Sequence, residues 1–167
     1  MWRPEEFLEF LKERRSIRSF QKKDIKKEHL QMILEAGRWT PSASNRQPWE
    51  FIVIKDKDIF QKISETAIYG KFFKRAALAI AIVGKPSESP SWYQVDTALV
   101  SMQMMLMAWT LDIGSCWIGA MDREKVKALL GISKEDYLLT VLPFGYIKGK
   151  VPKRTLRKSL EEIKKEI

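Results

Sequence analysis

Three arginines and a serine within five residues form the first group that could do chemistry. Arg14, Arg15, Ser16 and Arg18 lie in a short linker that follows an amphipathic pattern. Guanidinium groups bind phosphate oxygens through paired hydrogen bonds, and a neighbouring hydroxyl adds a further donor. Basic residues at the end of a helix also complement its dipole. Taken alone, this group fits a phosphate site and a helix terminus equally well.

A polar loop carries the second group. Residues 41–49 read PSASNRQPW and contain small hydroxyl side chains, the only asparagine of the chain and two prolines, directly before an apolar run. Asn and Gln amides donate and accept hydrogen bonds at once, which suits the polar edge of a heteroaromatic ring. Loops held by rigid strands often carry binding groups, whereas the same residue types also make plain turns.

Two later segments complete the candidates. Residues 114–120 read GSCWIGA, an apolar run with glycines where a flat ligand could approach the backbone; the alternative is a bend at the edge of a strand. Arg154, Arg157 and Lys158 follow the sequence PFGY at residues 143–146. This late basic cluster either closes over a phosphate held by the first group or forms a solvated tail.

The chain has one cysteine and one histidine, which restricts its chemistry. Cys116 can form no internal disulfide, and with His29 it offers too few ligands for a Cys/His zinc site. We therefore expect no metal site and a reducing, cytoplasmic setting. Cys116 lies in an apolar run without a nearby base, so we interpret it as a buried strand residue rather than a nucleophile. His29, beside Glu28, is interpreted as a surface residue.

The charge balance leaves several classes of partner to consider. The 167 residues include 30 Lys+Arg and 21 Asp+Glu, a net charge of +9. A polyanion, a membrane surface or a phosphate ligand under a basic exterior would each fit. The basic residues are spread along the chain without a nucleic-acid reading motif, and many lysines alternate with glutamates, as on a heat-adapted surface. The longest apolar run, residues 97–109, is shorter than the ~18–20 residues of a membrane helix. We expect neither a nucleic acid nor a membrane partner.

The elements that must position these groups follow from apolar spacing. Helices are expected from Pro4 to about Arg14, around residues 30–36 and 59–63, and at 92–112 and 122–130; strands are expected at 51–54, 77–83, 115–120 and 137–144. The helix at 92–112 is apolar nearly all round, so it should be a central buried helix or part of a subunit interface. This order predicts one domain over residues 1–167, an α+β or α/β sandwich with helices on both faces of a sheet.

Taken in order, the motifs at residues 14–20, 41–51, 114–119 and 143–146, with Arg157 downstream, resemble the nitroreductase family of FMN-dependent flavoproteins. The resemblance covers about residues 7–163. It implies an α+β sandwich with a mostly antiparallel sheet, a homodimer and two FMN molecules at the dimer interface. It also implies that each site takes residues from both subunits.

By position, the resemblance also implies roles for single residues. Arg14 and Ser16 would hold the FMN phosphate, and Arg157 would close the same site. Arg18 would face the pyrimidine edge, where a fixed positive charge stabilises the negative charge that reduction adds. The other subunit would supply the loop, and Ile118 and Gly119 would lie near N5. The full set of implied cofactor contacts is Arg14, Arg15, Ser16, Arg18, Pro41, Ser42, Ala43, Ser44, Asn45, Gln47, Ile118, Gly119 and Arg157.

The reaction implied by the resemblance is hydride transfer from NAD(P)H through flavin N5 to a nitroaromatic, quinone or flavin acceptor. No protein nucleophile is needed, because the cofactor carries the chemistry. The alternatives are a specialised flavin reaction, such as dehalogenation or flavin fragmentation, and a flavin carrier without turnover. The segment at residues 84–91 is short where longer members carry helical insertions, which predicts a more open pocket.

Overall fold

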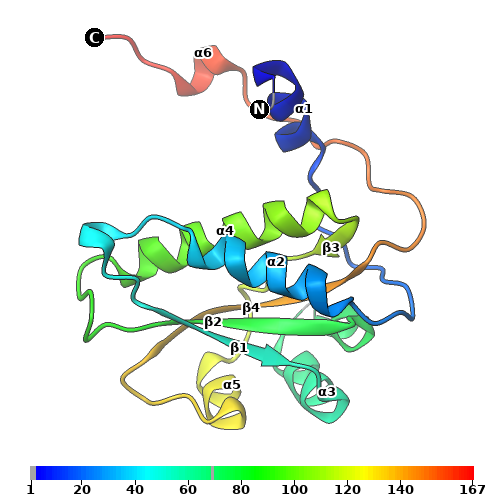
Figure 1. The fold of residues 1–167 in the computed structure, drawn as a ribbon, viewed down its shortest axis with the longest axis vertical. Helices are drawn as coiled ribbons and strands as arrows, with labels where there is room; N and C mark the ends of the chain where they lie inside the picture. Colours follow the sequence, from blue (N-terminus) through cyan, green and yellow to red (C-terminus); the bar gives the residue numbers. More distant parts are fainter. Residues whose placement is uncertain (1–2, 69) are drawn as a thin grey trace.

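The computed structural model describes residues 3–68 and 70–167, and it places a sheet between helices (Figure 1). The sheet has four strands in the order β1-β2-β4-β3, and every strand pairing in it is antiparallel. The strands are β1 (Trp49–Ile54), β2 (Leu78–Gly84), β3 (Ile113–Ser115) and β4 (Tyr137–Tyr146). The helices are α1 (Pro4–Glu13), α2 (Lys27–Arg38), α3 (Lys57–Thr66), α4 (Tyr93–Thr110), α5 (Arg123–Leu130) and α6 (Leu160–Ile163), with the 3-10 turns η1 (Ala43–Asn45) and η2 (Gly70–Arg75).

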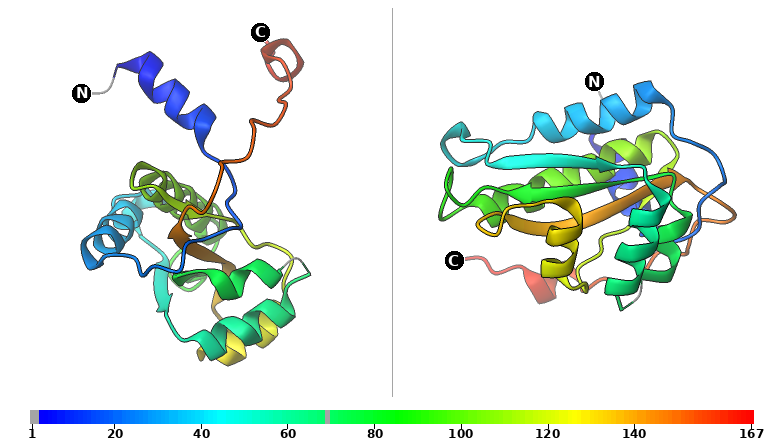
Figure 2. Two further views of the ribbon diagram at one scale, coloured as in Figure 1. Left: turned by 90° about the vertical axis from the view of Figure 1, so that its right-hand side faces the viewer. Right: turned by 90° about the horizontal axis from the view of Figure 1, so that it is seen from below.

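The two faces of the sheet are covered by different helices, so the predicted α+β sandwich is confirmed. Helices α2 and α4 lie on one face, while α3 and α5 lie on the other (Figures 1 and 2). Strand β2 is buried along its whole length, because its side chains enter both layers alternately. The side chains toward α2 and α4 are Leu78, Ile80 and Ile82, and those toward α3 and α5 are Ala79, Ala81 and Val83.

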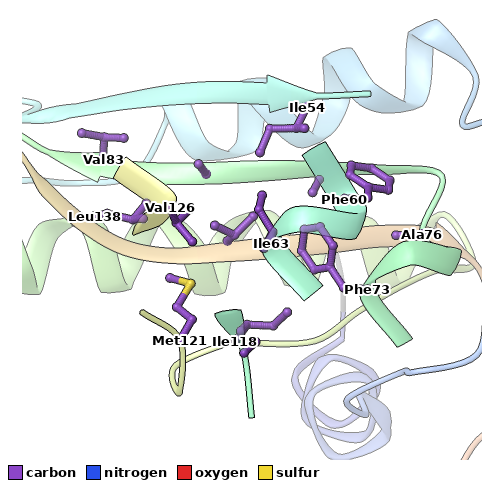
Figure 3. Packing of buried hydrophobic residues seen from close by; sticks show 14 of the residues in the cluster. Ile54, Phe60, Ile63, Phe73, Ala76, Val83, Ile118, Met121, Val126 and Leu138 are labelled. Atoms are coloured by element: carbon purple, nitrogen blue, oxygen red, sulfur yellow. The ribbon is translucent and has the colours of Figure 1, made fainter. Parts of the chain in front are cut away.

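The layer under α3 and α5 forms one wall of the candidate site. Phe60 and Phe73 pack edge to face with ring centroids 5.2 Å apart, and both are fully buried. Ile118 and Met121 join the same cluster from the segment after β3 (Figure 3). Because close-packed interiors leave little room for a side chain to move, the packing of Ile118 in this cluster fixes the position of residues 116–120.

Two terminal arms project from the body. Helix α1 buries none of its residues, and the chain after β4 leaves the sheet and ends in α6, which is also exposed (Figures 1 and 2). The arms meet where Arg154 donates to Glu9 at 2.9 Å. Leu8 and Leu156 on the arms are 51% and 98% exposed. Within the described residues, the apolar side chains of the arms are therefore not packed as those of the sheet are.

One expectation needs correction. The strand predicted at residues 115–120 spans Ile113–Ser115, because the chain leaves the sheet after Ser115 and Ile118 inserts into the core beneath α3. Helix α4 was expected to be either a central buried helix or part of a subunit interface. It has one buried face, whereas Val95, Leu99 and Met102 on it are 41% to 48% exposed, so the interface alternative stays a prediction. The segment around residues 69–74 includes Tyr69, which lies outside the described residues.

Candidate functional site

The segment that carries the first basic group runs extended across the sheet edge. The Ile17 amide donates to the Ser115 carbonyl at 2.9 Å, and Ser16 and Ser115 form an isolated parallel β-bridge. Ile17 and Phe20 are buried, while Arg18 is exposed. An added Cβ at Gly114 would lie 2.5 Å from Ile17. The Ile17 side chain therefore occupies the space beside the Gly114 backbone, and a side chain at position 114 would clash with it. The expectation that Gly114 lets a ligand approach the backbone is wrong.

A pocket of about 720 Å³ lies beside this segment, and we call it the Arg18 pocket. It is lined by Arg18, Ala67, Ile68, Lys71, Phe72, Cys116, Trp117, Ile118, Gly119 and Ala120. The Thr140 hydroxyl donates to the Ile118 carbonyl at 2.8 Å, and the Ile68 amide donates to the Ala120 carbonyl at 3.2 Å. These bonds hold the wall rigid. An added Cβ at Gly119 would meet nothing closer than 3.5 Å, so a flat group can approach the backbone there.

A second cavity of about 580 Å³, the Arg14 pocket, brings basic residues of both arms together, although Lys158 of the late basic cluster does not line it. Its lining includes Arg14, Arg15, Arg154 and Arg157. Arg15 donates to the Lys12 carbonyl at 2.7 Å, and Arg157 donates to Leu156 and Thr155. The predicted meeting of Arg157 with the first basic group is therefore seen within one chain.

Arg14 is the member of this pocket with an unsatisfied group. Its Nη1 is buried and has no hydrogen-bond partner in the described part of the chain. Burial lowers the pKa of the Arg14 guanidinium, and the nearby charges of Arg15 and Arg157 lower it further. A buried donor without an acceptor costs about 1–3 kcal/mol, more when it is charged. An anion in the pocket would supply the missing acceptor and the missing negative charge.

Cys116 lines the Arg18 pocket and lies near Arg14 of the second pocket. Burial raises the pKa of its thiol, while Arg18, Ser16 and Arg14 act in the opposite direction. The predicted burial of Cys116 is confirmed at 2% exposure, although the residue follows β3 rather than lying within a strand. His29 is half-buried, and its Nδ1 lies 3.0 Å from the Tyr146 hydroxyl, so it is more enclosed than the expected surface residue. Over residues 3–68 and 70–167, no three metal-ligating side chains cluster, and no helix is long and apolar enough to cross a membrane.

The polar loop lies at the opposite end of the molecule. The Ala43 amide donates to Asp96 Oδ1 at 3.3 Å near the start of α4. From Asp96 to Thr110, where α4 ends, the rise is roughly 20 Å at about 1.5 Å per residue. Figure 1 shows the loop, in cyan, at one end of α4 and β3 at the other. Within one chain, the loop lines neither the Arg14 pocket nor the Arg18 pocket.

The loop holds an uncommon backbone conformation. Ser44, Asn45 and Gln47 have φ of 53°, 55° and 52°, in the left-handed region that residues other than glycine rarely adopt. The Gln47 amide donates to Ser42 Oγ at 2.9 Å, which closes the loop. Ser44, Asn45 and Gln47 are exposed, as is Pro41. Such strain collects where a backbone is shaped for a ligand or a partner.

Some residues of the site were missed in the sequence. Lys71 and Phe72 line the Arg18 pocket, and the Arg18 guanidinium lies 5.9 Å from the centre of the Phe72 ring. They belong to the run GKFFKR, in which two phenylalanines lie between basic residues, and that pattern was the available signal. Asp96 also escaped notice, because a single carboxylate in an apolar helix gives no hint that it holds a loop more than 50 residues away.

Comparisons with known proteins identify the family. A sequence model of the Nitroreductase family matches residues 11–70 and 61–146. A "Putative NADH dehydrogenase/NAD(P)H nitroreductase" of Archaeoglobus fulgidus is 35% identical over 86% of this chain and 87% of its own length. An FMN-dependent nitroreductase structure from Clostridium difficile superposes with a TM-score of 0.85 at 28% identity, covering 96% of this chain and 98% of that one.

The same fold occurs in a "putative nitroreductase in complex with fmn" from Desulfovibrio desulfuricans, with a TM-score of 0.89 at 23% identity over 100% of this chain and 98% of that one. The sandwich fold, the ordered motifs and the family match agree with one another. This chain belongs to the nitroreductase family.

Proposed function

We propose that this chain is an FMN-dependent NAD(P)H oxidoreductase that reduces a nitroaromatic, a quinone or a flavin. The observation that carries the proposal is the buried Arg14 Nη1, which lacks an acceptor in a pocket of arginines within a nitroreductase-family fold. A phosphate supplies both the acceptor and the charge that this pocket requires. The relatives named as an NAD(P)H nitroreductase and an FMN-dependent nitroreductase support the choice of donor and cofactor.

The residues present fit FMN. Arg14 and Arg157, which line the Arg14 pocket, would hold the phosphate together with Ser16 from the following chain segment, and the Arg18 pocket would take the ring against Ile118 and Gly119. When bound, FMN supplies a ring that accepts a hydride from NAD(P)H at N5 and passes electrons to the acceptor. Arg18 would place a fixed positive charge at the polar edge of the ring and so stabilise its reduced form. The chain needs no nucleophile of its own for this chemistry.

We propose further that the site is completed by a second copy of the chain. The loop with Ser44 and Asn45 lines neither the Arg14 pocket nor the Arg18 pocket of its own chain, yet it has the exposed, fixed polar groups of a binding loop. Helix α4 also exposes Leu99 and Met102, and an apolar groove of about 590 Å³ runs between α1, α2 and α4. Exposed apolar surface of this kind supports an interface with a second chain.

An absorbance spectrum of the purified protein tests the redox function. We expect a flavin spectrum that bleaches on anaerobic addition of NADH or NADPH and returns when a nitroaromatic or quinone is added. Bound flavin that neither donor bleaches would favour the flavin-carrier alternative or a different reductant. Absence of flavin binding after addition of FMN would contradict the proposal.

Mixed dimers test the sharing of the site. In a dimer of Arg18→Ala with Asn45→Ala subunits, one site has both lesions and the other has none if the two residues come from different chains. We expect each parent dimer to be impaired and the mixture to regain activity through that intact site. A mixture no more active than its parents would contradict the shared site.

The setting of the enzyme is also part of the proposal. We propose a cytoplasmic protein with a heat-adapted surface, on the single cysteine and the lysine and glutamate pattern. The segment between β2 and α4 forms only turns and carries no helix that could cover a bound flavin. The choice of acceptor therefore depends more on redox chemistry than on a closed lid.

A further inference from the structure

A third cavity, of about 640 Å³, lies behind the segment that carries Arg18, and we call it the lysine pocket. Phe20 lines it, and Phe72, which lines the Arg18 pocket, lies with its ring centre 6.5 Å from that of Phe20. The two cavities therefore share an aromatic wall. The basic side chains in the lining are Lys22, Lys23, Lys57, Lys74, Arg75 and Lys148, against one carboxylate, Asp24.

The charges of this pocket are not balanced by the described part of the chain. None of the six basic side chains forms an ion pair with any described residue, whereas Lys85, outside the pocket, pairs with both Glu50 and Asp136. Lys57 is held by the Ala76 carbonyl at 2.8 Å, and Lys23 lies 4.7 Å from the centre of the Tyr146 ring. Like charges around one cavity repel, so the arrangement favours an anion between them.

Four cations of the pocket remain available for a ligand. Within the described residues, the side chains of Lys22, Lys74, Arg75 and Lys148 donate no hydrogen bond to a protein acceptor. The backbone beneath them is fixed, because the Lys148 amide donates to the Ser19 carbonyl at 3.1 Å and the Gln21 side chain donates to the Ile147 carbonyl at 2.8 Å. The site thus combines free charges with a rigid floor.

We propose that the lysine pocket binds a nucleotide that carries several phosphate groups. Lysine and arginine side chains that converge on one cavity match phosphates through charge-assisted hydrogen bonds. A cavity of about 640 Å³ has the size of a small-molecule site rather than of an extended nucleic-acid track. Two sources share this chemistry: the phosphate-bearing half of NADPH, and a free nucleoside triphosphate. Only the first source rests on the proposed function.

Calorimetric titration of the protein as purified, with ATP and with adenosine 2′,5′-bisphosphate, tests the site directly. We expect the double variant Lys74→Gln/Lys148→Gln to weaken the binding of at least one probe by about tenfold or more, since it removes two charge-assisted hydrogen bonds to phosphate. The control Lys62→Gln/Lys134→Gln removes the same charge from exposed positions outside the pocket and should leave binding unchanged. Equal affinity in all proteins, or an equal loss in both variants, would overturn the proposal.

Steady-state kinetics then separates the two sources. A rise of about tenfold in KM for NADPH in the pocket variant, with kcat and flavin content unchanged, identifies the hydride donor as the ligand. Lost ATP binding with unchanged KM for both NADPH and NADH identifies a free nucleotide. Absence of turnover with either donor contradicts the proposed function but leaves the titration result valid, so the two failures are distinguishable.

Discussion

Replacement of Arg14 should have opposite effects on cofactor binding and on the stability of the cofactor-free protein. Arg14→Met keeps the apolar stem of the side chain and removes the charge. In the cofactor-free chain, this change removes a buried Nη1 without an acceptor and relieves repulsion from Arg15 and Arg157. In the FMN complex, it deletes a charge-assisted hydrogen bond worth about 1.5–3 kcal/mol. The expected result is an FMN Kd raised roughly 10- to 150-fold and a Tm without FMN that is equal or higher.

The assay is titration of the apoprotein with FMN, followed by the quenching of flavin fluorescence, together with thermal unfolding without cofactor. Arg154→Met is the matched control, because Arg154 lines the same pocket but already pairs with Glu9 at 2.9 Å. Its FMN Kd should stay within about threefold of the wild type, as expected for an exposed ion pair. An unchanged FMN Kd in Arg14→Met, or a lower Tm of the apoprotein, would refute the reasoning.

Three further predictions follow from single contacts. Gly114→Ala, whose Cβ would come within 2.5 Å of a buried isoleucine, should lower Tm by the equivalent of about 1–3 kcal/mol, whereas Gly119→Ala should keep Tm and reduce FMN retention in a dialysis assay. Burial raises the pKa of the Cys116 thiol, so the folded protein should react slowly with iodoacetamide, as measured by mass spectrometry. The stability that the buried, neutral thiol contributes is complete below the ordinary thiol pKa of 9.0 and is lost as pH rises through the higher pKa of the folded state. Asp96→Ala should speed amide hydrogen exchange in residues 42–47, while Asp96→Asn, which keeps an acceptor, should not.

The fold could be predicted where one segment determines its own structure. Residues 78–84 form β2 because an uncharged, β-branched run is stable only with both faces covered. The short β3 could not be predicted, because the end of its pairing at Ser115 depends on where Ile118 packs beneath α3. Local pattern sets the type of an element, and tertiary contacts set where it ends.

The site divides in the same way. The basic group at residues 14–18 and the loop at 41–47 are contiguous motifs, so their chemistry can be read from neighbouring positions. Lys71 and Phe72 could not be assigned, because only the packing of η2 against the segment after β3 places them beside Arg18. Contacts between distant segments leave no local pattern in one sequence.

The strained loop and the unsatisfied arginine pose one physical problem in two separate parts of the molecule. The left-handed Ser44 and Gln47 cost about 1–3 kcal/mol each, and the buried Nη1 of Arg14 adds a penalty of similar size. These terms are large beside a total stability of about 5–15 kcal/mol. Within the described residues, hydrogen bonds to Ser42 and Asp96 hold the strained loop, whereas Arg14 Nη1 has no acceptor. FMN between two copies would offset both at once, since it would meet Arg14 of one chain and the loop of the other. Thermodynamic linkage then requires that FMN tighten the dimer by the factor by which dimerisation tightens FMN binding.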